Sequence, residues 1–598
     1  MVKFSFVKSI PYLLLLVFIV VCVIAYTGML SGLEQAPSPI YGGDIYHQLG
    51  GVEHVRQGGN VFESFATIGD SVSAYFPLFN IVVGGSALLF GLTSFSAVTL
   101  FSVLFFVLSI IVIFFLVKEL FGDAFVALLS TVFVVFIPLT TFMKYTGLAQ
   151  FIVFPLFVLL LVRFYKGASW VNTLLLGLVY GLCGLAHGSA FIAASLLFAC
   201  FGIFLVVGCF SKLSFNKVEL VLKVKKYYKF IVSFLVGFLL SLLYWLPVFK
   251  VFGNIPNKVT EWGQVNYSLG IVQLGFVGKF LQVFFSPFFF PLFGLILLFF
   301  IKKNSIIKFL VISGSLLCFH FFVSIPLFGL EFSPHYMLDF FNVIISVILI
   351  GLLLHFLLSF IKNKVFARVL IVIISVLLVM IVTVPVFNER VSDDRWISVG
   401  ETVLPEFFSE GAEWINNNTN LSDGFVSTKE LGSAVNALTG RRFISIRRNQ
   451  HALTSEVDER ELDLALLLYS NDNSVRDMVI DKYDIKYLYW NYYWFDSEFV
   501  VVNNSLVDFF DPIMLMYDVG MENTLINNNI SYVFNNMIVD SAKRNEPGVD
   551  SFDVLIVLPS QRGVFNPWAK ELDDYLFPVW DYSRDNVTYS IIYEVKNG

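Results

Sequence analysis

The polar segment DIYHQLGGVEHVR, at residues 44–56, holds the residues best suited to acid–base chemistry. Asp44, His47 and Glu53 lie within it, and His54 follows His47 by seven residues. If residues 45–55 form a helix, the two histidines share a face and Asp44 lies about one turn before His47. A carboxylate placed there can take a proton from a substrate hydroxyl as a general base. Asp44 could instead cap the helix, and the histidines could bind a metal ion.

Further polar residues stand in apolar surroundings elsewhere in the sequence. Lys144 and Tyr145 belong to the turn KYTGLAQ, Glu331 and His335 to the polar island EFSPHY, and Glu261 to a loop at 249–281. Polar groups at membrane depth are costly and usually line a cavity. We therefore expect Glu331 and His335 to line a substrate site, while the loop that carries Glu261 could order over a bound substrate. The alternatives are a membrane-edge turn at EFSPHY and a solvated surface around Glu261.

The composition requires a bundle of membrane-spanning helices to position these residues. The chain is 57% hydrophobic and 14% charged, with a mean hydropathy of +0.78, whereas soluble domains carry about 25% charged residues. A spanning helix needs roughly 20 mainly apolar residues. Eleven stretches qualify, at 10–28, 96–117, 124–142, 151–165, 170–187, 189–210, 230–248, 282–301, 306–326, 337–358 and 367–386. The stretch 75–92 is short and contains Pro77, and it could lie in the interface instead of crossing.

Charge divides the sequence into two parts. Residues 1–387 hold 22 Lys and Arg against 11 Asp and Glu, a net charge of +11, and residues 388–598 hold 17 against 34, a net charge of −17. With eleven spans, most basic loop residues fall on one side, which the positive-inside rule makes cytoplasmic. We therefore predict a transmembrane domain at 1–387 with a cytoplasmic amino terminus. The long first loop, 29–95, and the soluble domain at 388–598 would then be extracytoplasmic.

The acidic part is expected to fold as a mixed α/β domain. The strand-like segments GFVST, FISI, YLYW and VLIVLPS alternate with helical stretches near 406–416 and 460–482. Two arginine pairs, Arg441-Arg442 and Arg447-Arg448, flank FISI. These pairs could bind an anionic acceptor or phosphate, or they could form a solvated basic face.

This order of features resembles the GT-C superfamily of membrane glycosyltransferases. The first span is followed by a loop containing Gly42-Gly43-Asp44, and YFPLFNIVVGGSALLFGL at 75–92 is similar to an interfacial segment of that superfamily. LVKELFGDAFVALLSTVFVVFIPLTTFMKYTGLAQF is similar to the stretch across its second and third spans. The acidic part, from EWINNNTN to GRRFISIRRNQHA and on through DLALLLYSNDNSVRDMVIDKYDIKYLYW, is distantly similar to oligosaccharyltransferase catalytic subunits. However, STKELG stands where those enzymes have W-W-D-Y-G, and KYTGLAQ stands where they have Asp-x-Asp.

The resemblance implies a GT-C fold of about eleven transmembrane helices, and an inverting enzyme that transfers a sugar from a polyprenyl-phosphate donor of the dolichyl type. The acceptor would be an extracytoplasmic glycan or glycoprotein, Asp44 the catalytic base, and Lys144 or His335 the contact to the donor phosphate. The other expected substrate contacts are His47, Glu53, Tyr145, Glu261 and Glu331. A divalent metal is left open, and neither an organic cofactor nor a nucleic-acid partner is expected. The rivals are an oligosaccharyltransferase-like enzyme and a non-catalytic membrane transporter or scaffold with an external binding domain.

Overall fold

The chain divides into two compact units in a computed structural model. The helical unit comprises residues 1–32, 99–246 and 270–397, and the mixed unit comprises 33–98, 247–269 and 398–598. The predicted domain boundary at residue 387 lies outside the described residues. The structure describes residues 6–37, 43–69, 72–73, 75–132, 134, 139–210, 217–252, 305–318, 334–359, 366, 369–370, 373, 395–447, 457–502, 505–538, 551–560 and 566–596.

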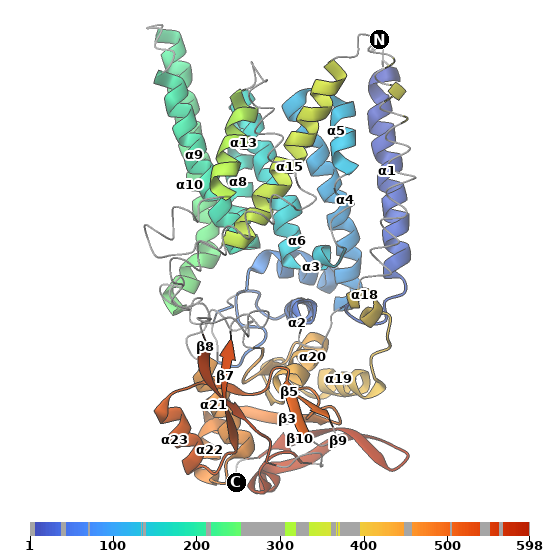
Figure 1. Cartoon of the computed structure of the whole chain (residues 1–598), viewed down its shortest axis with the longest axis vertical. Coiled ribbons are helices and arrows are strands. Elements are labelled where there is room, and N and C mark those ends of the chain that lie inside the picture. The colour runs from blue at the N-terminus through green and yellow to red at the C-terminus, as the bar shows by residue number, and fades with distance from the viewer. Residues whose placement is uncertain are drawn as a thin grey trace. The chain divides into compact units, whose positions relative to one another are not determined.

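Apolar helices make up the helical unit (Figure 1). They are long because their sequences run apolar for several turns before a charge appears; in α4, for example, Lys118 and Glu119 come only in the last turn. The elements are α1 (Phe6–Leu30), α4 (Ser94–Phe121), α5 (Ala124–Thr131), η2 (Leu139–Met143), α6 (Tyr145–Leu148), η3 (Ala149–Val153), α7 (Phe154–Lys166), α8 (Trp170–Ala186), α9 (Gly188–Phe210), α10 (Lys217–Phe252), α13 (Ser305–Cys318) and α15 (Pro334–Ser359). Among these, α4 and α10 begin or end in residues of the mixed unit.

Five helical stretches in the described part of the chain are long and apolar enough to cross a membrane. They are Ser9–Leu30, Ser94–Phe121, Tyr145–Lys166, Gly188–Val207 and Lys225–Val251. The protein is therefore an integral membrane protein, as its composition predicts. Helix α3 (Pro77–Phe90), within the ambiguous stretch 75–92, has 14 residues and is too short to span. The predicted spans at 282–301 and, for the most part, 367–386 lie outside the described residues.

Within the described residues, the mixed unit contains three β-sheets with helices packed on them (Figure 1). The five-stranded sheet has the order β2-β1-β3-β10-β9. Strands β2, β1 and β3 are parallel to one another, β10 is antiparallel to β3, and β9 is antiparallel to β10. A three-stranded sheet has the order β6-β8-β7, and β4 pairs with β5. The strands are β1 (Gly424–Val426), β2 (Arg442–Phe443), β3 (Ile485–Asn491), β4 (Phe499–Val502), β5 (Ser505–Phe509), β6 (Met514–Met516), β7 (Tyr532–Ile538), β8 (Ser551–Val557), β9 (Leu576–Arg584) and β10 (Val587–Val595).

Local sequence signals explain where these elements begin and end. Thr428 caps α20 by accepting a hydrogen bond from the Leu431 N–H, and Gly440 ends the helix at φ +68°, a conformation that glycine adopts without strain. Asp585 and Asn586 both have positive φ and join β9 to β10 in a tight hairpin. The helices are α2 (Asp44–Arg56), α3, α18 (Arg395–Gly400), α19 (Glu406–Asn418), α20 (Lys429–Thr439), α21 (Val457–Tyr469), α22 (Asn473–Tyr483), α23 (Val519–Asn527) and η8 (Lys570–Tyr575).

These assignments confirm the predicted helical transmembrane part and the mixed α/β domain in outline. Of the segment FISI, only Phe443 lies in a strand, β2, and the stretch 460–482 forms two helices, α21 and α22, instead of one. A single hydrophobic core joins helices α19 to α22 to the five-stranded sheet, with Phe425, Leu431 and Leu488 fully buried at its centre.

Candidate functional site

Asp44 is the first residue of helix α2, which confirms the helix predicted at 45–55. Gly43, with φ −65° and ψ 165°, occupies the N-cap position, so the alternative role of Asp44 as the helix cap is wrong. Residues Ile45 to His54 are all buried, whereas the Asp44 side chain is exposed. The helix therefore holds one carboxylate at the surface while the surrounding structure encloses the next ten residues.

Helix α2 lies between α3 and α20 (Figure 1). A Cβ atom on Gly50 would lie 1.9 Å from Oδ1 of Asn436 in α20. A Cβ on Gly51 would lie 2.5 Å from Nδ2 of Asn80 in α3. The adjacent glycines thus let both neighbouring helices approach α2 more closely than side chains would allow.

His47 is buried at 3% exposure, and its ring packs against Phe65 and Tyr75, with centroid distances of 4.8 and 4.1 Å. Burial lowers the pKa of His47 to about 3, although the nearby Asp44 carboxylate opposes this shift. His47 is therefore neutral at physiological pH and packs among aromatic rings. A neutral His47 side chain carries no positive charge for an anionic substrate group.

His54 is also buried, and its ring occupies the space beside Gly59, where a Cβ would lie 2.3 Å from Nε2. Burial, and secondarily the charge of Arg442, lowers the pKa of His54 to about 4. Within the described residues, no three His, Cys, Asp or Glu side chains are grouped so that they could hold a metal ion. The described residues thus assign no metal ligands beside Asp44, and the proposed reaction is written without a metal ion.

Glu53 is buried and fully engaged by neighbouring side chains. Its Oε1 accepts from Nη2 of Arg56 at 2.5 Å and from Nε2 of Gln57 at 2.7 Å. Its Oε2 accepts from Nε of Arg56 at 2.8 Å and from the Ser94 hydroxyl. Glu53, a substrate contact in the sequence prediction, thus uses both carboxylate oxygens to hold side chains of α2, Gln57 and Ser94.

Lys144 and Tyr145 belong to the helical unit, whereas Asp44 belongs to the mixed unit. The backbone of Lys144 leads into α6, where Gly147 N–H donates to the Lys144 carbonyl at 3.0 Å. The Tyr145 ring stacks on His187 at 5.3 Å and an interplanar angle of 18°. Helix α6 continues through the π-helical turn η3, a feature that is frequent at functional sites.

The remaining predicted site residues are Glu261, Glu331 and His335. Glu261 and Glu331 lie outside the described residues, and His335 belongs to α15 but its side chain is not among those described. Asp44, His47 and Glu53 therefore come together on α2, and Lys144 and Tyr145 come together at α6.

The sequence missed the role of the arginines around β2. Arg441 is only 2% exposed, so the predicted solvated basic face is wrong for this residue. Arg442 pairs with Glu63 at 3.0 Å, and Arg447 forms an ion pair with Glu430. A run of arginines in an acidic domain resembles a surface patch because nothing in the local sequence identifies partners such as Glu63, 379 residues away.

No known protein-family profile matches the chain. A region of 124 residues, 21% of the chain, is 37% identical to 91% of the uncharacterized protein MJ1080 of Methanocaldococcus jannaschii. The chain is distantly similar to the oligosaccharyltransferase AglB of Archaeoglobus fulgidus in complex with an inhibitory peptide and a dolichol-phosphate (13% identity, 85% of this chain, 75% of that chain, TM-score 0.49).

Two further solved structures are similar at the same level. One is ArnT of Cupriavidus metallidurans bound to undecaprenyl phosphate (11% identity, 90% of this chain, 97% of that chain, TM-score 0.44). The other is the arabinofuranosyltransferase AftD from Mycobacteria (13% identity, 94% of this chain, 40% of that chain, TM-score 0.45). All three likenesses are distant.

Proposed function

We propose that this chain, which belongs to the same family as the uncharacterized protein MJ1080 of Methanocaldococcus jannaschii, is an inverting membrane glycosyltransferase with Asp44 as its catalytic base. One observation carries this proposal: Asp44 is the exposed carboxylate at the start of a helix that is buried through the next ten residues. A catalytic base needs both properties, because it must reach the acceptor and must be held in a fixed position.

In the proposed reaction, Asp44 takes the proton of an acceptor hydroxyl while the hydroxyl oxygen forms a bond to the anomeric carbon of the donor sugar. The bond from that carbon to the phosphate oxygen breaks on the opposite side, so the configuration inverts. The polyprenyl phosphate leaves as an anion, and a cation such as Lys144 or His335 contacts it. The donor class follows from the resemblance of the sequence to GT-C enzymes. The acceptor is an extracytoplasmic glycan or glycoprotein.

The experiment that tests this proposal compares Asp44→Asn with Glu63→Gln in the full-length protein, with a polyprenyl-phosphate sugar as donor. Removal of a general base lowers a rate by about 10²–10⁴-fold, so Asp44→Asn should reduce kcat by at least about 100-fold. Glu63→Gln removes another partly exposed carboxylate of the same loop and should retain activity. Full activity of a folded Asp44→Asn variant contradicts the assignment of the base. If neither the variants nor the wild-type protein transfers sugar, the alternative of a non-catalytic transporter or scaffold is favoured.

The proposal includes eleven spans, a cytoplasmic amino terminus and an extracytoplasmic mixed unit. A membrane-impermeant maleimide applied to intact cells tests this sidedness. Asn586→Cys, in the exposed β9–β10 turn, should be labelled, whereas Lys166→Cys, in the basic loop assigned to the cytoplasm, should be labelled only after the cells are opened. The reverse pattern would place Asp44 on the wrong side for an exported glycan.

The oligosaccharyltransferase alternative depends on the segment Ser427 to Gly432, which stands where those enzymes have W-W-D-Y-G. Lys429 in this segment is fully buried and bonds to Glu461 and Asp511, at 3.3 and 3.0 Å. Glu430 is also buried and pairs with Arg447. These side chains are occupied by the domain itself, which supports a hydroxyl acceptor over an asparagine. Glycan transfer to a sequon peptide would reverse that preference.

A further inference from the structure

Helix α2, which carries Asp44, is built into the fold of the carboxy-terminal residues. Near its start, the Tyr46 hydroxyl donates to Oε1 of Gln35 at 2.7 Å, and Gln35 Nε2 donates to Oγ1 and the carbonyl of Thr402 at 2.7 and 2.9 Å. At its middle, Gly50 packs directly on Asn436 of α20. The position of α2 is therefore determined by residues that follow it by several hundred positions.

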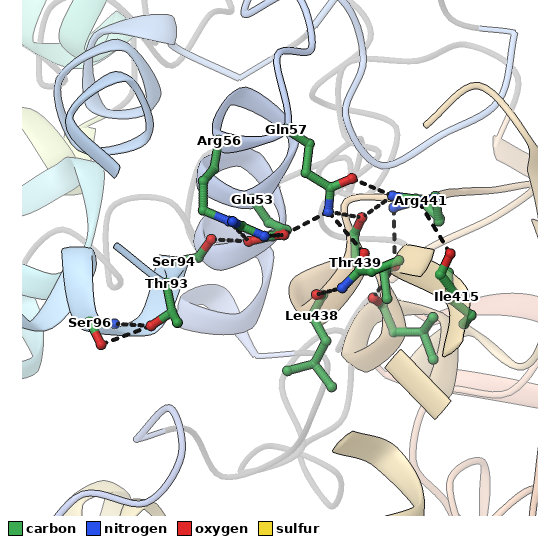
Figure 2. A network of polar contacts seen from close by, with 12 residues as sticks. Glu53, Arg56, Gln57, Thr93, Ser94, Ser96, Ile415, Leu438, Thr439 and Arg441 are labelled. Carbon is green, nitrogen blue, oxygen red and sulfur yellow. Dashed lines mark hydrogen bonds and ion pairs between the residues drawn. The ribbon is translucent and has the colours of Figure 1, made fainter. Parts of the chain in front are cut away.

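Arg441 forms the centre of the contacts at the other end of α2 (Figure 2). Its Nη1 donates to Oε1 of Gln57 at 2.5 Å and to the Thr439 carbonyl at 2.7 Å. Its Nε and Nη2 donate to Oγ1 and the carbonyl of Thr419, at 3.0 and 2.8 Å, and Nη2 also contacts the Ile415 carbonyl at 3.4 Å. A buried guanidinium is costly unless its donors are satisfied, so these contacts fix its position. Arg441 thus ties the ends of α19 and α20 to Gln57.

Gln57, the residue that follows α2, transmits this contact to the helix. Its Oε1 accepts from Arg441, and its Nε2 donates to Oε1 of Glu53 at 2.7 Å, to the Thr439 carbonyl at 2.9 Å and to Oδ1 of Asn416 at 3.0 Å. Glu53 in turn holds Arg56 and the Ser94 hydroxyl at the start of α4. Figure 2 shows the continuous chain of polar contacts from Arg441 through Gln57 and Glu53 to Ser94.

The segment after α2 is also incorporated into the carboxy-terminal fold. The Phe443 N–H donates to the Ala66 carbonyl at 2.9 Å, and the Ile68 N–H donates to the Phe443 carbonyl at 3.0 Å. Thr67 therefore pairs with Phe443 as a parallel bridge beside β2. Arg460 of α21 donates from Nη1 to the Ile68 carbonyl at 2.7 Å. The first loop thus extends the edge of the five-stranded sheet at Thr67.

We propose that Arg441 and Gln57 are positioning residues for the base Asp44, so that the carboxy-terminal domain sets the orientation of the carboxylate in the transfer reaction. This inference rests on the proposed function. From the Gly50 contact to Asp44 the helix rises about 9 Å, so a tilt of about 6° displaces the carboxylate by about 1 Å. A displacement of about 1 Å in a reacting group can cost about 100-fold in rate. Loss of the contacts at Gln57 permits such a tilt about Gly50.

The experiment measures sugar transfer by the full-length protein in Gln57→Ala and Arg441→Ala, with Arg476→Ala as the matched control. Arg476 is another fully buried arginine of the mixed unit, and it bonds to the Leu467 and Ser470 carbonyls and to Asn473, far in sequence from α2. We expect kcat to fall about 10-fold in Gln57→Ala and about 100-fold in Arg441→Ala, with the donor KM within about 2-fold. Arg476→Ala should lower the Tm but leave the kcat of the folded protein within about 2-fold.

Hydrogen exchange of the amides of Ile45 to His54 provides a readout that does not depend on activity. Exchange there should accelerate at least about 10-fold in the Gln57 and Arg441 variants and should stay unchanged in Arg476→Ala. If Gln57→Ala and Arg441→Ala both keep the wild-type kcat, or if Arg476→Ala loses as much kcat as they do, the positioning role is overturned. If wild-type protein transfers no sugar, the proposed function fails, and the exchange rates alone decide whether Arg441 and Gln57 hold the helix.

Discussion

The two ends of helix α20 each bury a cation, but they surround it differently. At the amino-terminal end, Lys429 is fully buried and contacts two carboxylates, those of Glu461 and Asp511. At the carboxy-terminal end, the Arg441 guanidinium donates hydrogen bonds to backbone carbonyls, to the Thr419 hydroxyl and to the side-chain amide of Gln57. The charge of Lys429 is therefore balanced by carboxylates of the same domain. The charge of Arg441 is shared among neutral acceptors, one of which, Gln57, belongs to the first loop.

The two cations are therefore expected to act differently, Lys429 on the stability of the domain and Arg441 on the orientation of α2. An ion pair that loses one buried partner leaves an uncompensated charge, so the Lys429 end is critical for the stability of the domain. Neutral acceptors around a guanidinium fork demand a specific geometry, so the Arg441 end is suited to hold two segments in register. Among the substitutions that test this contrast, we expect the free energy of unfolding to fall most in Lys429→Met, less in Gly50→Ala and least in Arg442→Ala.

Substitution Lys429→Met should have the largest effect. It removes the ammonium group that contacts the buried carboxylates of Glu461 and Asp511, and breaking a buried pair of this kind costs about 3–5 kcal/mol. Denaturant unfolding followed by the fluorescence of the buried Trp494 and Trp568 measures this loss. The matched control is Lys482→Met, which removes a partly exposed pair with Glu459 and Asp463 and should cost less than about 1 kcal/mol. Equal losses in the two variants would remove the distinction between the ends of α20.

Substitution Gly50→Ala tests the contact of α2 with α20 from the loop side. The new Cβ meets Oδ1 of Asn436, whose Nδ2 is held by the Phe65 and Arg441 carbonyls, so the amide cannot move away freely. Overpacking of this kind costs about 1–3 kcal/mol, measured in the same unfolding experiment. Gly85→Ala in α3, where the added Cβ meets nothing within 4 Å, should be neutral or stabilising. A neutral Gly50→Ala would mean that α2 is not packed tightly on α20.

The Lys429 end should also make stability depend on pH. Burial raises the pKa of Glu498 to about 8; Lys429 opposes this shift, and Asp511, Glu461 and Glu430 reinforce it. Between the unfolded pKa near 4.5 and pH 8, the folded state holds a proton that the unfolded state has lost. Stability should therefore fall as pH rises through this range, by up to about 1.4 kcal/mol per pH unit, and level off above pH 8.

Unfolding of Glu498→Gln at several pH values checks this slope. The amide stays neutral at every pH, so the variant should lose most of the decline between pH 5 and 8. A decline of the same size in wild type and variant would assign it to other groups.

Substitution Arg442→Ala should have the smallest effect. Its pair with Glu63 is at 3.0 Å, but the two side chains are 20% and 42% exposed, so solvent screens their attraction. We expect a loss below about 1 kcal/mol in the free energy of unfolding, reduced further by salt. A loss comparable to that of Arg441→Ala would indicate that the contact of the loop with the domain is distributed over both arginines.

Local sequence patterns predicted the elements of this fold but not their partners. The helix after Gly43 and the alternation of strands and helices after residue 400 follow from residue periodicity and turn residues, and they are confirmed. The same patterns predicted Asp44 as a polar residue at the start of this helix. The engagement of Glu53 was not, because Gln57 can be recognised as a bridge only once Arg441, 384 residues later, is placed beside it. The burial of Arg441 was missed because arginine is usually exposed.

The long sequence separation of Gln57 and Arg441 also has a consequence for biosynthesis. At about 5–20 residues per second, the 384 residues between them take about 20–80 s to synthesise. During that interval the glycine face of α2 has no α20 to cover it, and the Ala66–Ile68 backbone has no β2 to pair with. The proposed catalytic Asp44 is thus synthesised early, but helix α2 is fixed in place only after residues 429–443 have left the ribosome.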